Sequence, residues 1–477
     1  MAAALNLAFD DEDGRLPVTV GRLLDFSDDP LACMRRQLAE HGPISALQQD
    51  GQRVYFAFGP EYNHRLLAEH TQFLSQFFTI RGGRNTAQRR LSSGLLSMNG
   101  EQHKRNRRLV MDAFQKRAMQ GYLPAIQRLT EGMLADWQPG QQRDISRDMT
   151  EFMLRLTSSM LFGLDQPELA WRIGRMIDRW VHLNHEVGMG AFVSDPQFAE
   201  RYAELLEFAD TLEAEIRGMI ALRKAAVEPG TDALSLLIAA HDEHGSISDD
   251  ELVGQAALLF GAAHLTTANT FTWTLFLLAQ HPACMERLHA ELQRELTGGF
   301  PSPQQSERLV WTDAVIKESM RLMPASAYLQ RTTAEPCQLG PFSLPKGAPI
   351  IFSQLMTHHQ PELFPQPRRF RPERWQGLNP SPYAYLPFGA GPRMCIGGPL
   401  AMLILKMVLP TILQRFKLTV VPYAEINARI VSTMLCAVSP VRMQVDAPDG
   451  RFTAQPVRGS IHSVVDLGES MAARRAA

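Results

Sequence analysis

Apolar residues recur at the three- and four-residue spacing of an α-helix through much of residues 120–240. The stretches 151–156 and 202–208 are clear examples, because charged side chains alternate there with apolar ones. One face of such a helix can pack on a core while the other meets water. We therefore predict mostly helices here, which pack or cover a pocket, and identify no candidate catalytic residue among them.

The longest predicted helix begins after Ser248 and ends before His281-Pro282. Ser248 and Glu251 have the spacing of a capping box, and the proline ends the pattern. Residues 256–267 are apolar nearly all round, which is typical of a buried helix. This stretch contains Thr266-Thr267, and hydroxyls in a buried helix commonly bond back to the preceding turn.

Short strands are predicted where apolar runs flank turn residues. Residues 44–58 fit a hairpin around Asp50-Gly51, a strong turn signal. Residues 341–352 fit a strand, a turn and a second strand, and residues 432–436 fit a tight strand turn. The prolines that follow, from 361 to 372, favour an irregular but ordered meander.

Both ends of the chain differ from its middle. The first ten residues are short, apolar and then acidic, without the basic start of a signal peptide or the ~20 apolar residues of a membrane anchor. Residues 450–477 contain few large apolar side chains, so we predict a loosely attached tail.

Composition narrows the range of partners and compartments. The 48 basic and 50 acidic residues nearly balance, which argues against nucleic acid or a polyanionic substrate. The five cysteines are odd in number and dispersed, a pattern typical of reduced thiols in the cytoplasm. We expect a cytoplasmic protein without a membrane anchor.

One cysteine lies in an unusual loop, residues 388–398, which contains four glycines, and Gly398-Pro399 then opens another apolar run. Glycine permits tight turns and close approach of another group to the backbone. Proline at a first helical position places Cys395 just before a helix N-terminus, whose partial positive charge favours a thiolate. A lone cysteine is more often a small buried apolar residue, so the spacing around it decides between these interpretations.

That spacing resembles the haem-binding signature of the cytochrome P-450 superfamily, Phe-x-x-Gly-x-Arg-x-Cys-x-Gly. The fixed positions are Phe388, Gly391, Arg393, Cys395 and Gly397. The resemblance implies that Cys395 binds the iron of haem b, that Arg393 contacts a propionate and that Phe388 and Gly397 shape the cofactor site. A cysteine thiolate ligand pushes electron density onto iron and favours cleavage of the O–O bond.

Other residues match the family pattern only when several of them are considered together. His103 and Arg107 share a helix face that alone suggests a solvated basic surface; the resemblance implies that they bind propionates, as does Arg331. Glu318 and Arg321 alone suggest a weak surface pair, whereas the family pairs them with the arginine of a later motif, here Arg374, as a buried structural triad.

The central helix departs from the family pattern, Ala-Gly-x-acid-Thr-Thr, at two positions. Ala263, beside the haem, replaces the usual glycine, and Leu265 replaces the usual acid. The resemblance makes Thr266 and Thr267 the catalytic candidates. At 100° per residue, His264 points about 200° away from Thr266, so we predict that it does not replace the missing acid. The candidate substrate residues are Phe77, Phe78, Ala262, Tyr328 and Met434.

The resemblance covers about residues 20–445 and implies a single domain, residues 1–477, mostly α with a small β-rich lobe (α+β). The cytochrome P-450 fold holds haem between the central helix and the helix after the cysteine. The implied protein is a monomeric monooxygenase that transfers one atom of O₂ to an apolar small molecule. The chain has no flavin or ferredoxin segment, so we expect electrons from a separate ferredoxin or flavodoxin with its reductase.

Two alternatives stay open. Leu265 is compatible with a peroxide-using or oxygen-independent haem-thiolate enzyme, which needs no redox partner. A haem-binding sensor without turnover is the other, although the retained Thr266 speaks against it.

Overall fold

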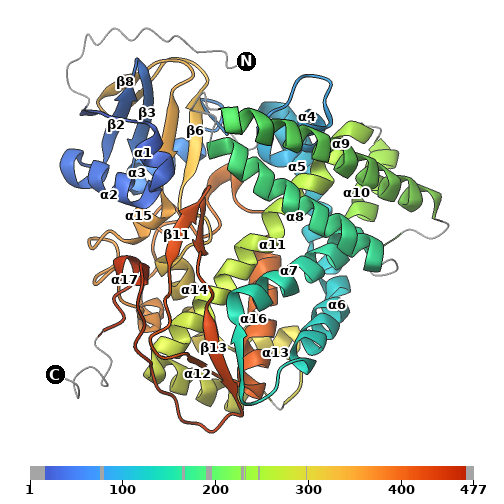
Figure 1. Cartoon of the computed structure of the whole chain (residues 1–477), viewed down its shortest axis with the longest axis vertical. Helices are drawn as coiled ribbons and strands as arrows, with labels where there is room; N and C mark the ends of the chain where they lie inside the picture. Colours follow the sequence, from blue (N-terminus) through green and yellow to red (C-terminus); the bar gives the residue numbers. More distant parts are fainter. Residues whose placement is uncertain are drawn as a thin grey trace.

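A computed structural model describes residues 17–75, 80–163, 167–189, 196–226, 230, 232–244, 248–296 and 298–468. Helices form most of the molecule, and a β-rich lobe lies at one side (Figure 1). This arrangement confirms the prediction of a mostly helical α+β fold.

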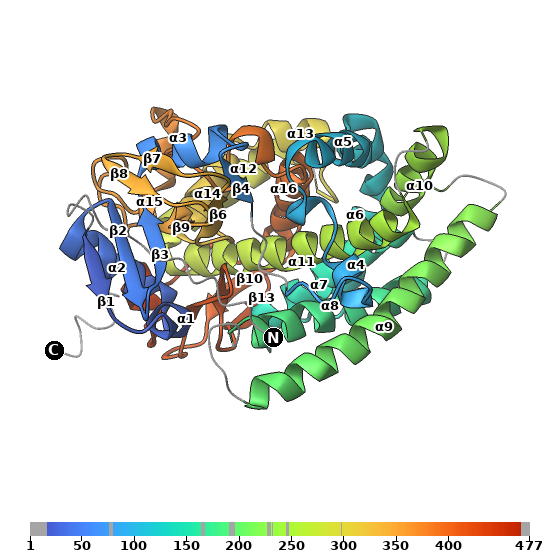
Figure 2. The same cartoon turned by 90° about the horizontal axis from the view of Figure 1, so that it is seen from above.

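The helix α11 (Asp249–Gln280) runs through the middle of the molecule (Figure 2). In that view α12 (Pro282–Glu295), α14 (Val310–Leu322) and α16 (Gly398–Arg415) lie on one side, and α7 (Ile145–Phe162) and α8 (Pro167–Met189) lie on the other. Most α11 side chains are buried because neighbours surround it.

Both predicted ends of α11 are confirmed. The Ser248 side chain accepts a hydrogen bond from the Glu251 backbone N–H, and the Glu251 side chain accepts one from the Ser248 N–H. His281 is the C-cap and Pro282 begins α12. Sequence signals therefore define the position of this helix, which carries the threonine pair.

The remaining helices surround this centre. They are α1 (Leu24–Asp28), α2 (Pro30–His41), α3 (Pro60–Ala68), α4 (Ala87–Leu91), α5 (Gly100–Met111), α6 (Lys116–Ala135), α9 (Pro196–Ala225), α10 (Ala233–His244), α13 (Pro303–Glu307), α15 (Gln354–His358) and α17 (Ile461–Val464), with short 3₁₀ turns at Leu95–Ser97, Asp112–Phe114, Pro372–Gln376 and Gly391–Arg393. The helical prediction for residues 120–240 is confirmed in their described parts.

The largest sheet has the strand order β1-β2-β3-β9-β6-β4. Its strands are β1 (Val18–Val20), β2 (Ile44–Gln49), β3 (Gln52–Ala57), β4 (Phe73–Ser75), β6 (Leu329–Thr333) and β9 (Pro349–Phe352). The predicted hairpin is β2–β3, which pairs Gln49 with Gln52 across a turn where Asp50 and Gly51 have φ of 47° and 78°. Two positive φ angles explain the Asp-Gly pair.

Smaller sheets complete the β structure. They are β10 (Lys417–Val420) with β13 (Arg442–Asp446) and β5 (Gln141–Asp144), β11 (Ala428–Val431) with β12 (Met434–Ala437), and β7 (Cys337–Leu339) with β8 (Phe342–Leu344). The predicted turn at 432–436 joins β11 to β12, with Ser432 at a φ of 57°.

The prediction of a loose C-terminal tail is wrong for residues 451–468. Ile461, Val464 and Val465 are fully buried in the main core. The carbonyl oxygens of residues 462 and 463 accept hydrogen bonds from Arg368 and Arg35. A few well-placed apolar side chains and arginine donors fix this segment, although its overall composition suggests little packing.

Among the described residues, only α16 is long and apolar enough to meet the length and composition of a membrane span. It is 61% buried inside the protein, so the same apolar side chains serve the core.

Candidate functional site

The Cys395 loop makes a tight turn between the β-rich lobe and α16. The Cys395 N–H donates to the Phe388 carbonyl oxygen at 2.8 Å, which closes the loop. Gly389 and Gly391 have φ of 68° and 71°. A Cβ on Gly391 would also lie 2.6 Å from the Leu67 carbonyl oxygen, so this position requires glycine on both counts.

The Cys395 sulfur lies at the start of α16, as the sequence predicts. Gly397 is the N-cap and α16 begins at Gly398. Burial among neighbouring groups raises the pKa of the thiol, while the backbone N–H groups of Gly397 and Gly398 and the charge of Arg107 lower it. Cys395 is nevertheless the one cysteine of the five whose residue is exposed, whereas the other four are buried or partly buried.

Four candidate propionate donors, one histidine and three arginines, gather near this loop. His103 and Arg107 come from α5, Arg331 comes from β6 and Arg393 lies in the loop itself. Burial, Arg393 and Arg107 lower the pKa of His103 to about 4. Burial and Arg393 lower that of Arg331 to about 9, and burial and Arg107 lower that of Arg393 to about 10. Burial is the largest cause of each shift, repulsion between the cations adds to it, and no carboxylate is among the groups that act on these three side chains.

The partners of these cations are neutral in the described chain. Arg107 donates to the Met394 carbonyl oxygen at 2.7 Å, and Arg393 donates to the Met98 carbonyl oxygen and to Asn99 Oδ1. Arg331 donates to the Gln330 carbonyl oxygen at 2.9 Å. None of the three has an ion pair with a carboxylate among the described residues. The buried Nε2 of His70, which is close enough to lower the pKa of His103, also lacks a partner there.

This donor set fits a haem. A single thiol can bind iron, and a cluster of cations short of negative charge suits the two propionate carboxylates. Outside this loop, the described residues contain no group of three or more His, Cys, Asp or Glu side chains arranged to hold a metal ion. His70 is a donor that the sequence did not single out; its Nδ1 lies 3.3 Å from the Ala68 carbonyl oxygen, and its effect on His103 joins two segments that are far apart in the chain.

The Glu318, Arg321 and Arg374 triad is buried. The Glu318 and Arg321 side chains are 0% exposed, and Arg374 is 7% exposed. Arg321 Nη2 and Arg374 Nε each lie 2.9 Å from Glu318 Oε1. Glu318 also accepts from the Trp375 indole and the Arg371 backbone N–H. These donors satisfy a carboxylate that water cannot reach, which is the requirement for a stable buried charge.

One face of α11 is partly accessible beside the Thr266 turn, residues 262–266. Ala262, Ala263, Thr266 and Asn269 share this face and are only partly buried, whereas Thr267 is 7% exposed. The Thr266 hydroxyl donates to the Ala262 carbonyl oxygen at 2.9 Å. Asn269 was not predicted; its Nδ2 lies 3.4 Å from Cys436 Sγ, and the three-residue spacing from Thr266 is the signal that identifies its face.

The prediction that His264 points away from Thr266 is confirmed. Its ring is fully buried and lies 3.0 Å from the carboxylate of Asp178 on α8. Sequence reasoning missed Asp178, because nothing in a helical pattern identifies a partner 86 residues away.

The candidate substrate residues have different surroundings. Met434 is partly exposed at the β11–β12 turn and bridges to Ser326. The Tyr328 side chain is 5% exposed and its ring packs edge-on against Phe26 at 5.2 Å, so it contributes to core packing. Phe77 and Phe78 lie outside the described residues.

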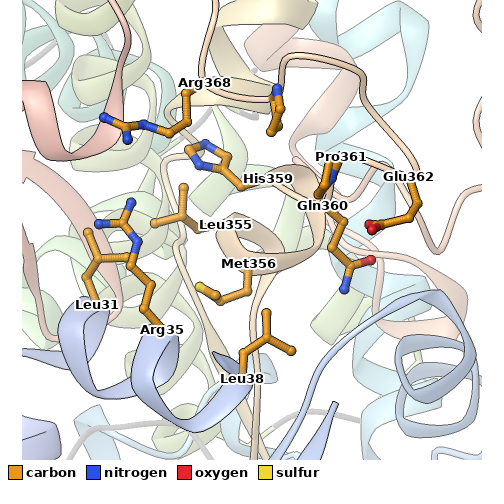
Figure 3. A pocket seen from close by; sticks show the side chains of 11 residues that line it. Leu31, Arg35, Leu38, Leu355, Met356, His359, Gln360, Pro361, Glu362 and Arg368 are labelled. Carbon is orange, nitrogen blue, oxygen red and sulfur yellow. The ribbon is translucent and has the colours of Figure 1, made fainter. Parts of the chain in front are cut away.

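Two hollows elsewhere contain none of the predicted haem or substrate residues. One of about 550 Å³ lies between α2, α15 and the loop that reaches Arg368 (Figure 3). Its Arg35 and Arg368 side chains hold the C-terminal segment through the carbonyl groups of Ser463 and His462. The other, of about 470 Å³, lies on the surface of α5 and is lined by Glu101, Gln102, Arg105 and Arg108.

Known proteins share this combination of fold and site. The sequence model described as Cytochrome P450 matches residues 15–445. The chain is 31% identical to the cyclooctat-9-en-7-ol 5-monooxygenase of Streptomyces melanosporofaciens, over 81% of this chain and 84% of that protein. It is 28% identical to the pentalenene oxygenase of Streptomyces avermitilis, over 88% of this chain and 94% of that protein.

Solved structures agree on the fold. The retinoic acid-bound cyanobacterial CYP120A1 superimposes with a TM-score of 0.79 and 23% identity, over 91% of this chain and 99% of that one. The haem domain of cytochrome P450DA gives the same TM-score and the same identity, over 92% of this chain and 99% of that one.

Proposed function

Because the chain belongs to the cytochrome P450 family and is a monooxygenase, we propose that its substrate is a cyclic terpene or a terpene alcohol. The similarity to the cyclooctat-9-en-7-ol monooxygenase, over most of both chains, carries this proposal. The α11 face supports it, because Ala262 and Ala263 present only methyl groups and leave room for a bulky apolar skeleton.

The family binds haem b, which supplies the activation of O₂ when it is bound. In our proposal the Cys395 thiolate would bind its iron. His103, Arg107, Arg331 and Arg393 hold the propionates, with His70 as a further donor. Phe388, Gly397 and Ala263 shape the surfaces against the ring.

We assign proton delivery to Thr266. Its hydroxyl is bonded to the Ala262 carbonyl oxygen and lies on the accessible face, so it can hold a water molecule there. Thr267 is buried and faces the packing side, which makes it the weaker of the two catalytic candidates. Ala262, Asn269 and Met434 then border the substrate, and Phe77, Phe78 and Tyr328 stay as less supported candidates.

Electrons come from a separate ferredoxin or flavodoxin and its reductase in this proposal. The exposed Arg105 and Arg108 of α5 and Lys116 and Arg117 of α6 form a basic docking face, which suits an acidic partner. We further propose that the protein acts as a monomer in the cytoplasm.

Substrate-binding spectra test the substrate class. A panel of cyclic sesquiterpenes, cyclic diterpene alcohols, steroids, fatty acids and simple aromatics is titrated into the haem-loaded protein. We expect a displacement shift and micromolar binding with cyclic terpenes or their alcohols. Tighter binding of steroids or fatty acids would reject terpenes as the substrate class.

A peroxide-using enzyme is the second candidate, and Leu265 favours it because leucine cannot carry a proton. Product formed with a surrogate ferredoxin, its reductase and reduced nicotinamide supports the monooxygenase. Product formed only with added hydrogen peroxide supports the alternative. A protein that binds terpenes and forms product under neither condition would be a sensor.

A further inference from the structure

The His264 ring faces two groups that can only accept hydrogen bonds when Asp178 is ionised. Its Nδ1 lies 3.1 Å from the Phe260 carbonyl oxygen, and its Nε2 lies 3.0 Å from Asp178 Oδ1. A neutral imidazole has only one N–H. The ring must therefore carry both protons, or Asp178 must carry one.

The surroundings of Asp178 favour the first arrangement. Its side chain is 27% exposed, so water reaches the carboxylate. Burial raises its pKa, but the His264 contact and the charges of His182 and Arg175 together keep the pKa below its usual value. An ionised Asp178 requires that His264 donates from both nitrogens. The pair is then an imidazolium and a carboxylate, with the imidazolium fully buried.

This contact lies at a close crossing of α8 and α11. A Cβ on Gly174 of α8 would lie 2.8 Å from the Phe260 ring, and one on Gly261 of α11 would lie 3.1 Å from Val181. The two glycines allow the backbones to approach, and the Asp178–His264 pair is the polar contact between them. His264 is two residues before Thr266 and belongs to the same turn.

The pair does not conduct protons to Thr266. On the inner side His264 Nδ1–H ends at the Phe260 carbonyl oxygen, which has no proton to pass on. Its contribution must therefore be to position the helix rather than to transfer a proton. A charge pair whose cation is buried suits this role, because separating α8 from α11 would leave the His264 charge unpaired in the interior.

We propose that the buried His264 and the partly exposed Asp178 form an ion pair that fixes α8 on α11 and thereby positions the Thr266 turn for oxygen activation. Both residues are positioning residues, since neither faces the accessible side of α11. The effect on catalysis rests on the proposed role of Thr266, whereas the ion pair and its hold on α8 do not.

Nitrogen-15 NMR of the histidine rings tests the pair directly in the haem-loaded, diamagnetic carbon monoxide complex. At neutral pH we expect both ring nitrogens of His264 to be protonated, and this signal to vanish in Asp178→Asn. The buried His358 and His359 should be neutral, because burial and the charge of Arg321 lower their pKa, that of His359 to about 3. A His264 ring with one protonated nitrogen would overturn the proposal.

Amide hydrogen exchange tests whether the Asp178–His264 contact stabilises α8 against local opening. Loss of a charge-assisted contact should speed exchange in residues 174–181 by roughly tenfold in Asp178→Asn and His264→Gln. The double variant should exchange no faster than either single variant, because both remove the same contact. Unchanged exchange, or additive effects, would contradict the proposal.

The fraction of reducing equivalents that end in product rather than in hydrogen peroxide tests the consequence for catalysis. We expect each variant to release more hydrogen peroxide per reducing equivalent, while Asp178→Glu keeps the wild-type ratio. His281→Gln is the matched control, because His281 is also a partly buried histidine bonded to a carbonyl oxygen four residues back, Leu277 at 2.7 Å. Equal uncoupling by His281→Gln would assign the effect to general damage. Faster α8 exchange without uncoupling would keep the ion pair and reject its link to Thr266.

Discussion

The Cys395 loop precedes α16 and the Thr266 turn lies within α11, and the two differ in how far they follow the family pattern. The loop keeps every fixed residue, and its geometry depends on local features: two glycines with positive φ and a backbone hydrogen bond from Cys395 to Phe388. The turn lacks the usual acid, and a pair between α11 and α8 lies beside it. The geometry of the loop is therefore constrained by residues close in sequence, whereas the surroundings of the turn depend on a contact between two helices.

The largest expected effect is on the stability of the protein, through the buried triad. Glu318→Ala removes the shared partner of Arg321 and Arg374 and leaves buried positive charge, which costs ~3–5 kcal/mol. We expect little folded, haem-loaded protein, measured by expression yield and chemical denaturation. Glu335→Ala is the control, because the Glu335–Lys346 pair is 65% exposed on both sides and contributes little. A Glu318→Ala protein of normal stability would show that the triad is not structural.

The next effect concerns the Thr266 turn itself. Thr266→Val removes the hydroxyl but keeps the shape, and positioned proton transfer contributes typically ~10²–10⁴-fold in rate. Coupled product formation should fall while cofactor consumption continues and hydrogen peroxide accumulates. Thr272→Val is the control, since Thr272 makes the same bond to a carbonyl oxygen one turn back, on Ala268, and is buried. Intact rate and coupling in Thr266→Val would favour the peroxide-using alternative.

Much of this comparison could be predicted from the sequence, because the relevant signals are local. The capping box at Ser248, the Asp50-Gly51 turn and the helix after Cys395 all follow from residues a few positions apart. The triad is an exception that spans 56 residues, and only the resemblance to a known family identified it.

The features that the sequence did not predict depend on contacts between distant segments. Asp178 meets His264 only because α8 crosses α11, and a helical pattern does not specify its crossing partner. The segment 451–468 is held by Ile461, Val464 and Val465, which are too few to raise its average hydrophobicity. Composition therefore underestimated how firmly it packs.

A smaller effect is expected on haem retention, in a variant whose folding should not change. His103→Ala combined with Arg107→Gln removes two propionate donors, each of which contributes roughly 1.5–3 kcal/mol as a charge-assisted hydrogen bond. We expect faster loss of haem to apomyoglobin, with little change in secondary structure. Lys104→Gln with Arg108→Gln alters two exposed residues of the same helix and should not change haem loss. Unchanged haem retention in the first variant would exclude both residues from the propionate site.

The smallest expected effect is on the rate of electron transfer from the redox partner. Electrostatic steering by Arg105, Arg108, Lys116 and Arg117 should weaken as added salt screens exposed charges. Reduction by an acidic ferredoxin should slow with rising ionic strength and in Lys116→Gln with Arg117→Gln. Arg201→Gln on α9 is the control and should leave the rate unchanged. A rate insensitive to salt would place the docking face elsewhere.

The most direct test of the account is the absorption spectrum of the reduced carbon monoxide complex of Cys395→Ser. A thiolate ligand gives this complex its red-shifted band, so we predict that the wild-type protein shows the band and the variant loses it. The variant should still contain the buried triad and the cation cluster, and circular dichroism can confirm that it folds. A folded Cys395→Ser protein that retains the band would show that another residue binds the iron, and would contradict the assignment of the site.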